Sequence, residues 1–202
     1  MYISRTFVLN PKKMCLSNIK KITVPEEGIK CYKVAKVVRF EKPDDYGDTV
    51  MLESPYQHFM YRVGETYTIQ AQMEPEIEDD PWDAGFKRLY GNAYHACADY
   101  EGLFRVLDNV QAQLFSTRDM AVLECTIPAD SRYVYEGLFS SKKGYASSNL
   151  RIDRIVPPEE VEEELQKCGL TRRLFSLINF PKIETIKRSQ LPTDESVGLT
   201  DA

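Results

Sequence analysis

In this sequence histidine is the scarcest of the residue types that usually act in catalysis. His58 and His95 are its two histidines, so a catalytic assembly built on imidazole must use one of them. His95 stands two residues before Cys97, where alternate residues of a strand would share a face. Two side chains on the same face of a strand point in the same direction, whereas a nucleophilic Cys97 and a basic His95 would have to point toward each other. We therefore expect a half-buried His95 that is hydrogen-bonded once to the backbone.

Motifs that bind phosphate or activate a nucleophile are absent from the sequence. It contains neither the glycine-rich loops of nucleotide-binding proteins nor the Gly-x-Ser-x-Gly turn of serine hydrolases. Zinc sites are typically built from closely spaced cysteine and histidine pairs, and the five cysteines include no Cys-x-x-Cys. We therefore expect no metal site and no cofactor.

Composition and charge are those of an ordinary globular protein. Of the 202 residues 43% are hydrophobic and 28% charged, and 31 acidic against 26 basic residues give a net charge of −5. This balance disfavours a broad phosphate-binding surface, so nucleic acid is not the expected partner. No apolar run is long enough to cross a membrane, and we expect no membrane contact. The odd number of cysteines, without an export signal, predicts reduced thiols and a cytoplasmic protein.

The elements expected around these residues are mostly strands. Amphipathic spacing predicts a helix at 100–114, inserted after residue 98, and two C-terminal helices at 159–168 and 171–179. Alternating and β-branched residues predict strands at 31–40, 49–52, 66–73, 91–97, 120–127, 132–135 and 149–156.

The order of these elements predicts the fold class. Because strands come in runs rather than alternating with helices, we expect an α+β fold with a curved, mostly antiparallel sheet. Residues 1–180 are expected to form a single domain. The last residues, 181–202, have little apolar content and are expected to form a flexible C-terminal tail.

Three short motifs resemble a group of small, uncharacterised bacterial and bacteriophage domains. They are a Tyr-Lys-Val strand at 32–34, a Tyr-x-x-Gly turn at 61–64 and a Gly…His-Ala-Cys strand at 91–97, which precedes a helix. The resemblance covers roughly residues 31–156. It implies a bacterial or bacteriophage origin and brings no known reaction with it.

Small curved sheets of this organisation are also similar to ADP-ribosyltransferase-like folds, which implies an alternative function. In those folds an aromatic residue stacks on nicotinamide, an early polar residue holds a ribose and a late glutamate stabilises an oxocarbenium-like transition state. The alternative is therefore an enzyme that handles a nucleotide or NAD. Its candidate residues are Lys33 or Arg39 early, Tyr61, Tyr94 and His95 in the middle, and Glu136 late.

The leading hypothesis is a protein-binding module of uncertain catalytic activity. Residues 74–83 form an acidic segment with the only tryptophan, and Phe59 and several tyrosines precede it. Aromatic side chains on a surface are typical anchors of protein interfaces. We expect another protein as the partner and leave the oligomeric state open. The expected binding residues are Trp82, Tyr56, Tyr61, Glu76, Asp79 and Asp80, with Tyr67 beside them.

Overall fold

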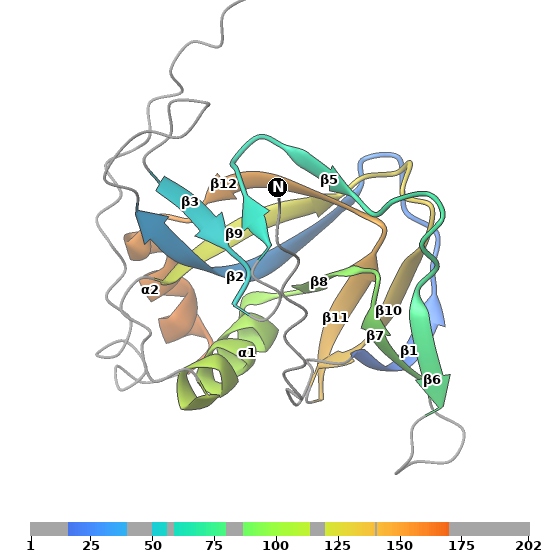
Figure 1. Ribbon diagram of the computed structural model, residues 1–202. Helices are drawn as coiled ribbons and strands as arrows, with labels where there is room; N and C mark the ends of the chain where they lie inside the picture. Colours follow the sequence, from blue (N-terminus) through green and yellow to red (C-terminus); the bar gives the residue numbers. More distant parts are fainter. Residues whose placement is uncertain are drawn as a thin grey trace, which may run out of the picture.

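The computed structural model describes residues 16–39, 50–55, 59–79, 87–113, 120–139 and 141–169. Within these ranges twelve strands form one sheet, and two helices pack against it (Figure 1). The helix expected at 171–179 and the tail expected at 181–202 lie outside the described residues.

The strands of the described ranges include two long central ones and several short ones. Helix α1 (Tyr100–Gln113) lies between β8 and β9 in the chain, and α2 (Pro158–Lys167) follows β12. The strands are β1 (Leu16–Lys21), β2 (Ile29–Arg39), β3 (Val50–Glu53), β4 (Met60–Tyr61), β5 (Thr66–Thr68), β6 (Glu76–Asp79), β7 (Lys87–Gly91), β8 (Tyr94–Cys97), β9 (Met120–Ile127), β10 (Val134–Phe139), β11 (Lys142–Ser147) and β12 (Asn149–Ile155).

The expected α+β class is wrong, because the described chain is dominated by one antiparallel sheet. Its strand order is β5-β12-β9-β2-β8-β11-β10-β1-β7-β6, and β3 and β4 branch from β2. The helix expected after residue 98 and the first C-terminal helix are confirmed as α1 and α2. The error arose at β1, β6 and β11, whose lysine, glutamate and serine residues have a low strand propensity. Pairing with neighbouring strands outweighs that propensity.

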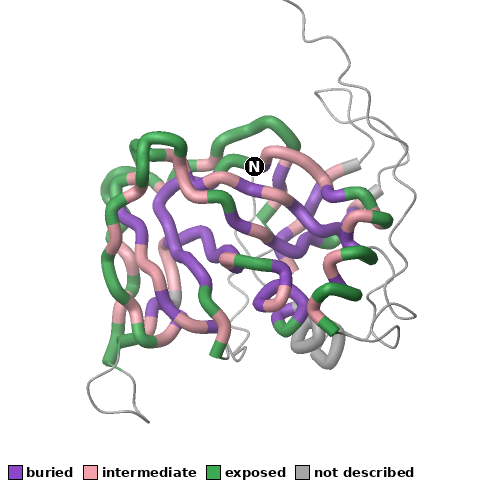
Figure 2. The backbone as a smooth tube through the Cα atoms, turned by 180° about the vertical axis from the view of Figure 1, so that it is seen from behind, coloured by how far each residue is buried: buried purple, intermediate pink, exposed green. Residues whose placement is uncertain are grey.

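Side-chain alternation on the central strands divides the core into two clusters. On β2, Val34 faces the cluster that contains the buried residues of α1 and α2, such as Phe104 and Leu165. Cys31 and Ala35 face the other cluster, on the opposite side of the sheet. In Figure 2 buried residues run along the middle of the chain's strands, and exposed residues gather at the connections.

The two ends of the strand order are joined by a short connection. Residues 69–75 link β5 to β6, and seven extended residues span at most about 25 Å. The sheet must therefore curve strongly to bring its edges this close. Arg132 holds the connection by donating hydrogen bonds to the carbonyl oxygens of Ala71, Gln70 (3.2 Å) and Met73 (2.5 Å) and to Glu74 (3.2 Å).

An ion-pair network fastens α2 to the sheet. The Arg154 guanidinium on β12 donates to both Glu160 carboxylate oxygens of α2 (2.7 and 2.8 Å) and to Glu124 of β9 (2.8 Å). Lys30 of β2 lies 2.9 Å from the same Glu124 carboxylate. Burial alone would raise the pKa of Glu124, but hydrogen bonds from Lys30 and Arg154 outweigh it and lower that pKa. The hydrogen bond from Arg154 likewise lowers the pKa of Glu160.

The Arg154→Met variant is expected to lose about 1 kcal/mol of unfolding free energy at pH 7, a modest loss because Arg154 and Glu160 are 40% and 38% exposed. In the wild type the carboxylate contribution is complete above the unfolded-state pKa values and disappears as the pH falls through the lower folded-state values. Urea unfolding from pH 7 to pH 3 should therefore show the two proteins converging in acid. A constant difference across this range would contradict the role of the network.

Candidate functional site

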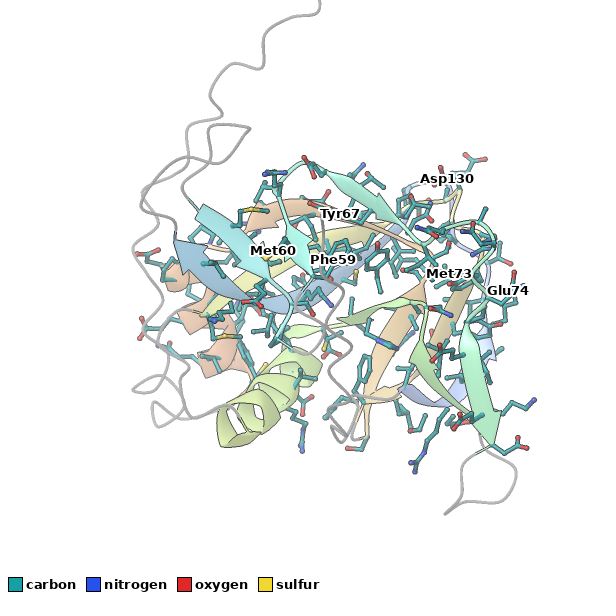
Figure 3. All side chains as sticks on the ribbon, in the orientation of Figure 1. Phe59, Met60, Tyr67, Met73, Glu74 and Asp130 are labelled. Carbon is teal, nitrogen blue, oxygen red and sulfur yellow. The ribbon has the colours of Figure 1, made fainter. Side chains whose placement is uncertain are left out.

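Four aromatic rings from β4, β5, β8 and the residue before β4 meet on the side of the sheet opposite the helices. We call Phe59, Tyr61, Tyr67 and Tyr94 the aromatic cluster. The Phe59 ring centroid lies 5.1 Å from that of Tyr61, 5.3 Å from that of Tyr67 and 5.7 Å from that of Tyr94. Figure 3 shows Phe59 and Tyr67 together beside Met60. Tyr61 is fully buried, whereas Phe59 is 38% exposed, so the cluster has a buried base and an open top.

Local backbone structure sets the positions of these rings. The Ser54 amide donates to the Phe59 carbonyl oxygen (2.7 Å), and β3 pairs with β4 through Leu52 and Tyr61. Gly64 adopts a φ of 88°, the left-handed conformation that suits glycine in the turn between β4 and β5. The turn thus carries the chain from Tyr61 back to Tyr67.

The Tyr67 hydroxyl is fixed by two hydrogen bonds. It accepts one from the Arg62 amide (2.6 Å) and donates one to the Glu65 carboxylate (2.8 Å). Burial, followed by the bond to Glu65, raises the pKa of Tyr67. The phenol therefore keeps its proton at physiological pH, and its ring stays against Phe59.

A buried lysine lies beneath the cluster, at a seam in the sheet. Strands β2 and β8 share one described register pair, Tyr32 with Cys97, and we call this short pairing the seam. The Lys33 Nζ donates to the His95 carbonyl oxygen (2.8 Å) across this seam and lies 5.6 Å from the Tyr61 ring centroid. Burial lowers the pKa of Lys33. Within the described ranges no carboxylate contacts it, and its polar neighbours are the His95 carbonyl oxygen, the Tyr61 ring and the thiols of Cys31, Cys97 and Cys125.

The His95 side chain is a core residue rather than an accessible base. Its ring is 5% exposed and stands 5.8 Å from the Phe139 ring, edge to face. Burial and the nearby Lys33 lower the pKa of His95 to about 3, against a hydrogen bond with the Leu89 backbone that raises it. Among the described residues nothing bonds Nε2. The imidazole is therefore neutral at physiological pH, and it is more buried than the half-buried histidine expected from the sequence.

The thiols near Lys33 are neutral as well. Burial raises the pKa of Cys97 and Cys125 to about 12, and it also raises the pKa of Cys31. These three and Cys168 are free cysteines. In the described part of the chain no three histidine, cysteine or acidic side chains come together in a way that could hold a metal ion.

The candidate residues of the enzyme hypothesis are only partly brought together. Lys33 lies beside the Tyr61 ring and donates to the His95 carbonyl oxygen, whereas Tyr94 contacts Phe59 and Tyr67 in the aromatic cluster. Glu136 lies on β10, where its carboxylate pairs with Lys143 (2.7 Å). The side chain of Arg39 lies outside the described residues. No described contact places a carboxylate opposite Lys33.

The residues expected to bind a partner are scattered. Glu76 and Asp79 are exposed on β6, an edge of the sheet. Tyr61 is fully buried and supports Phe59 from below instead of offering its own surface. Trp82, Tyr56 and Asp80 lie outside the described residues.

The burial of Lys33 was not predicted from the sequence. The signal was present, because Cys31, Ala35 and Val37 occupy alternate positions around it and form an apolar stripe. Comparison of the chain with models of protein families, with curated proteins and with solved structures finds no match. Neither helix of the described chain has the length and apolar character needed to cross a membrane.

Proposed function

We propose that this chain is a cytoplasmic protein-binding module that takes an apolar side chain of its partner against Phe59 and Tyr67. The observation that carries the proposal is the Phe59 ring, which is 38% exposed yet held by three tyrosine rings. An aromatic side chain that is already fixed loses little conformational freedom on binding, and such residues dominate the affinity of many interfaces.

Charges of both signs surround the cluster. Glu65 accepts a hydrogen bond from the Tyr67 hydroxyl, and Arg151 of β12 is the register partner of Thr66. The acidic residues further along the chain pair with Arg132 or lie on β6, and they are Glu74, Glu76, Glu78 and Asp79. The proposal therefore specifies an apolar side chain of the partner and no charge.

The same site gives less support to the nucleotide-handling enzyme. A neutral, buried His95 cannot donate a proton at physiological pH, and Glu136 is paired with Lys143 away from Lys33. A binding role needs neither residue. The geometry therefore supports binding at the aromatic cluster better than catalysis at the seam.

Selection from a displayed library of random peptides tests this proposal on the full-length protein. We expect enrichment of peptides that carry aromatic or aliphatic side chains. The Phe59→Ala variant should weaken their binding at least tenfold, as loss of an interface anchor does. Met73→Ala is the matched control, because Met73 is similarly exposed (42%) but belongs to the connection before β6. Its affinity should stay unchanged.

Two results would contradict the proposal. One is the absence of any enriched peptide, and the other is equal affinity of the enriched peptides for wild type and Phe59→Ala. Urea unfolding of both variants checks that the fold is intact, since Phe59 is partly buried.

A further inference from the structure

Lys33 lies beneath two of the tyrosines that hold the Phe59 ring. Its Nζ atom is 5.6 Å from the centroid of the Tyr61 ring, and it donates a hydrogen bond to the His95 carbonyl oxygen (2.8 Å). His95 follows Tyr94 directly on β8. The ring centroids of Tyr61 and Tyr94 lie 5.1 and 5.7 Å from that of Phe59. One amine therefore contacts the ring of one tyrosine and the backbone beside the other.

The charge of Lys33 decides how strong these two contacts are. A cation within about 6 Å of an aromatic ring centroid is attracted to the ring, and more strongly where water is excluded. A hydrogen bond from a charged donor is also roughly twice as strong as one from a neutral donor. Lys33 is 8% exposed, and in the described part of the chain no carboxylate competes for its ammonium group. Both contacts weaken when the amine loses its proton.

Stability alone does not explain a lysine at this position. A buried charge without a counter-charge is costly, and an apolar residue of similar size avoids that cost. Titratable side chains in such surroundings are found preferentially at functional sites. The contacts of Lys33 with the supports of Phe59 indicate which function it serves.

We propose that Lys33 is a positioning residue of the binding site, whose ammonium group holds Tyr61 and Tyr94 against Phe59. The affinity of the site then depends on the charge of a residue that the partner does not touch. This inference rests on the proposed function, because it takes Phe59 as the anchor. A ring that is fixed before binding loses less conformational freedom on binding. Without the ammonium group the Phe59 ring is held less firmly, and the partner binds more weakly.

Burial holds the other titratable groups around Lys33 in their neutral forms. They are Cys31 on β2, His95 and Cys97 on β8, Cys125 on β9 and Tyr61 on β4. Burial raises the pKa of the thiols and of the phenol, and it lowers the pKa of the imidazole to about 3. The pKa of Lys33 lies below its ordinary value of 10.5. Lys33 is thus the one of these groups that becomes neutral as the pH rises toward 10.5.

The affinity of the Lys33→Met variant tests the proposal. The probe is the tightest-binding peptide of the library selection, synthesised with blocked ends and without titratable side chains. At pH 6 we expect Lys33→Met to bind it about tenfold more weakly than wild type, within the range by which residues in contact affect one another. Lys30→Met is the matched control, because it removes an exposed lysine of the same strand that pairs with Glu124. Its affinity should equal that of wild type.

Two further readouts separate positioning from a general effect on the fold. In the Phe59→Ala background the Lys33→Met substitution should weaken binding no further, since its effect passes through the Phe59 ring. Between pH 6 and 10.5 the affinity of wild type should fall to that of Lys33→Met, while the affinity of the variant stays constant. A lysine that only stabilised the fold would give neither result.

A measurement on the free protein does not depend on a peptide. In protein with ¹³C-labelled phenylalanine rings, the Phe59 signals of wild type should shift with pH together with the Lys33 Cε signal. In Lys33→Met the Phe59 signals should be displaced and independent of pH. The ring of Phe104, which is buried on the other side of the sheet, is the internal control and should give the same signals in both proteins.

The outcomes distinguish this inference from the proposed function. Equal affinities of wild type and Lys33→Met, or a wild-type affinity that does not change with pH, would overturn the role of Lys33 and leave the Phe59 anchor standing. Phe59 signals that are identical in the two proteins would overturn it as well. If no peptide binds wild type but the Phe59 signals still follow the charge of Lys33, the proposed function fails and the positioning of Phe59 by Lys33 stands.

Discussion

Truncation of Tyr61 to alanine is expected to lower the free energy of unfolding by about 4 kcal/mol, as for other buried aromatic residues. Its side chain is fully buried, contacts the rings of Phe59 and Tyr67 and lies over the Lys33 Nζ. The expected loss combines the lost apolar burial with the cavity left between β4 and the central strands. Urea unfolding monitored by circular dichroism measures it directly.

The Tyr61→Phe variant separates the ring from its hydroxyl. The hydroxyl is buried without a hydrogen bond among the described residues, although Ser54 is near enough to lower a pKa that burial raises. Removal of a buried polar group without a partner costs nothing, so Tyr61→Phe should be as stable as wild type or slightly more stable. If Tyr61→Phe lowered the free energy of unfolding as much as Tyr61→Ala, the stabilisation would come from a hydrogen bond of the hydroxyl and not from burial of the ring.

The two variants also test how the cluster acts in binding. Tyr61 does not reach the surface, so its effect on a ligand must pass through the position of Phe59. Tyr61→Phe should bind the selected peptides with wild-type affinity. The weakened binding expected of Tyr61→Ala should be recovered in Tyr61→Phe, which makes Tyr61 a positioning residue.

Strands with strong local patterns could be predicted from the sequence. The run at Met120–Ile127 is rich in apolar residues and ends at a proline, and it is confirmed at the same bounds as β9. The expected strand at 66–73 shrinks to Thr66–Thr68 in the structure. Its alternation continues to residue 73, but Arg132 binds the carbonyls of residues 70, 71 and 73 and holds them in the connection. That contact joins residues about sixty positions apart, which no local pattern reveals.

The candidate site depends on such distant contacts throughout. Lys33 and the His95 carbonyl meet because β2 lies next to β8, and this order is a property of the whole sheet. The spacing of the tyrosines suggests that they form a cluster. It does not show which of their rings is buried and which is exposed. The structure buries Tyr61 and leaves Phe59 as the exposed ring. Burial of this kind is decided by the pairing of β3 with β4, not by residue type.

Replacement of Lys33 by methionine is expected to raise the free energy of unfolding at pH 7 by about 2 kcal/mol, as often happens when a buried charge is replaced by an apolar residue of similar size. Methionine fills the volume of the lysine stem beneath Tyr61 without the cost of burying an amine. Against this gain stands the lost hydrogen bond to the buried His95 carbonyl oxygen, which costs about 2 kcal/mol and which the gain from removing the buried amine must exceed. Lysine at this position therefore makes the fold less stable than it could be.

The pH dependence of the difference identifies its cause. Burial holds the pKa of Lys33 below its ordinary value of 10.5, so the unfolded chain binds this proton more tightly than the folded chain. Wild-type stability should consequently rise relative to Lys33→Met as the pH increases from the folded-state pKa toward 10.5, and the advantage of methionine should shrink. Urea unfolding of both proteins at pH 7, 9 and about 10.5 measures this convergence. A Lys33→Met protein less stable than wild type at pH 7 would show that the bond across the seam outweighs the burial of the amine.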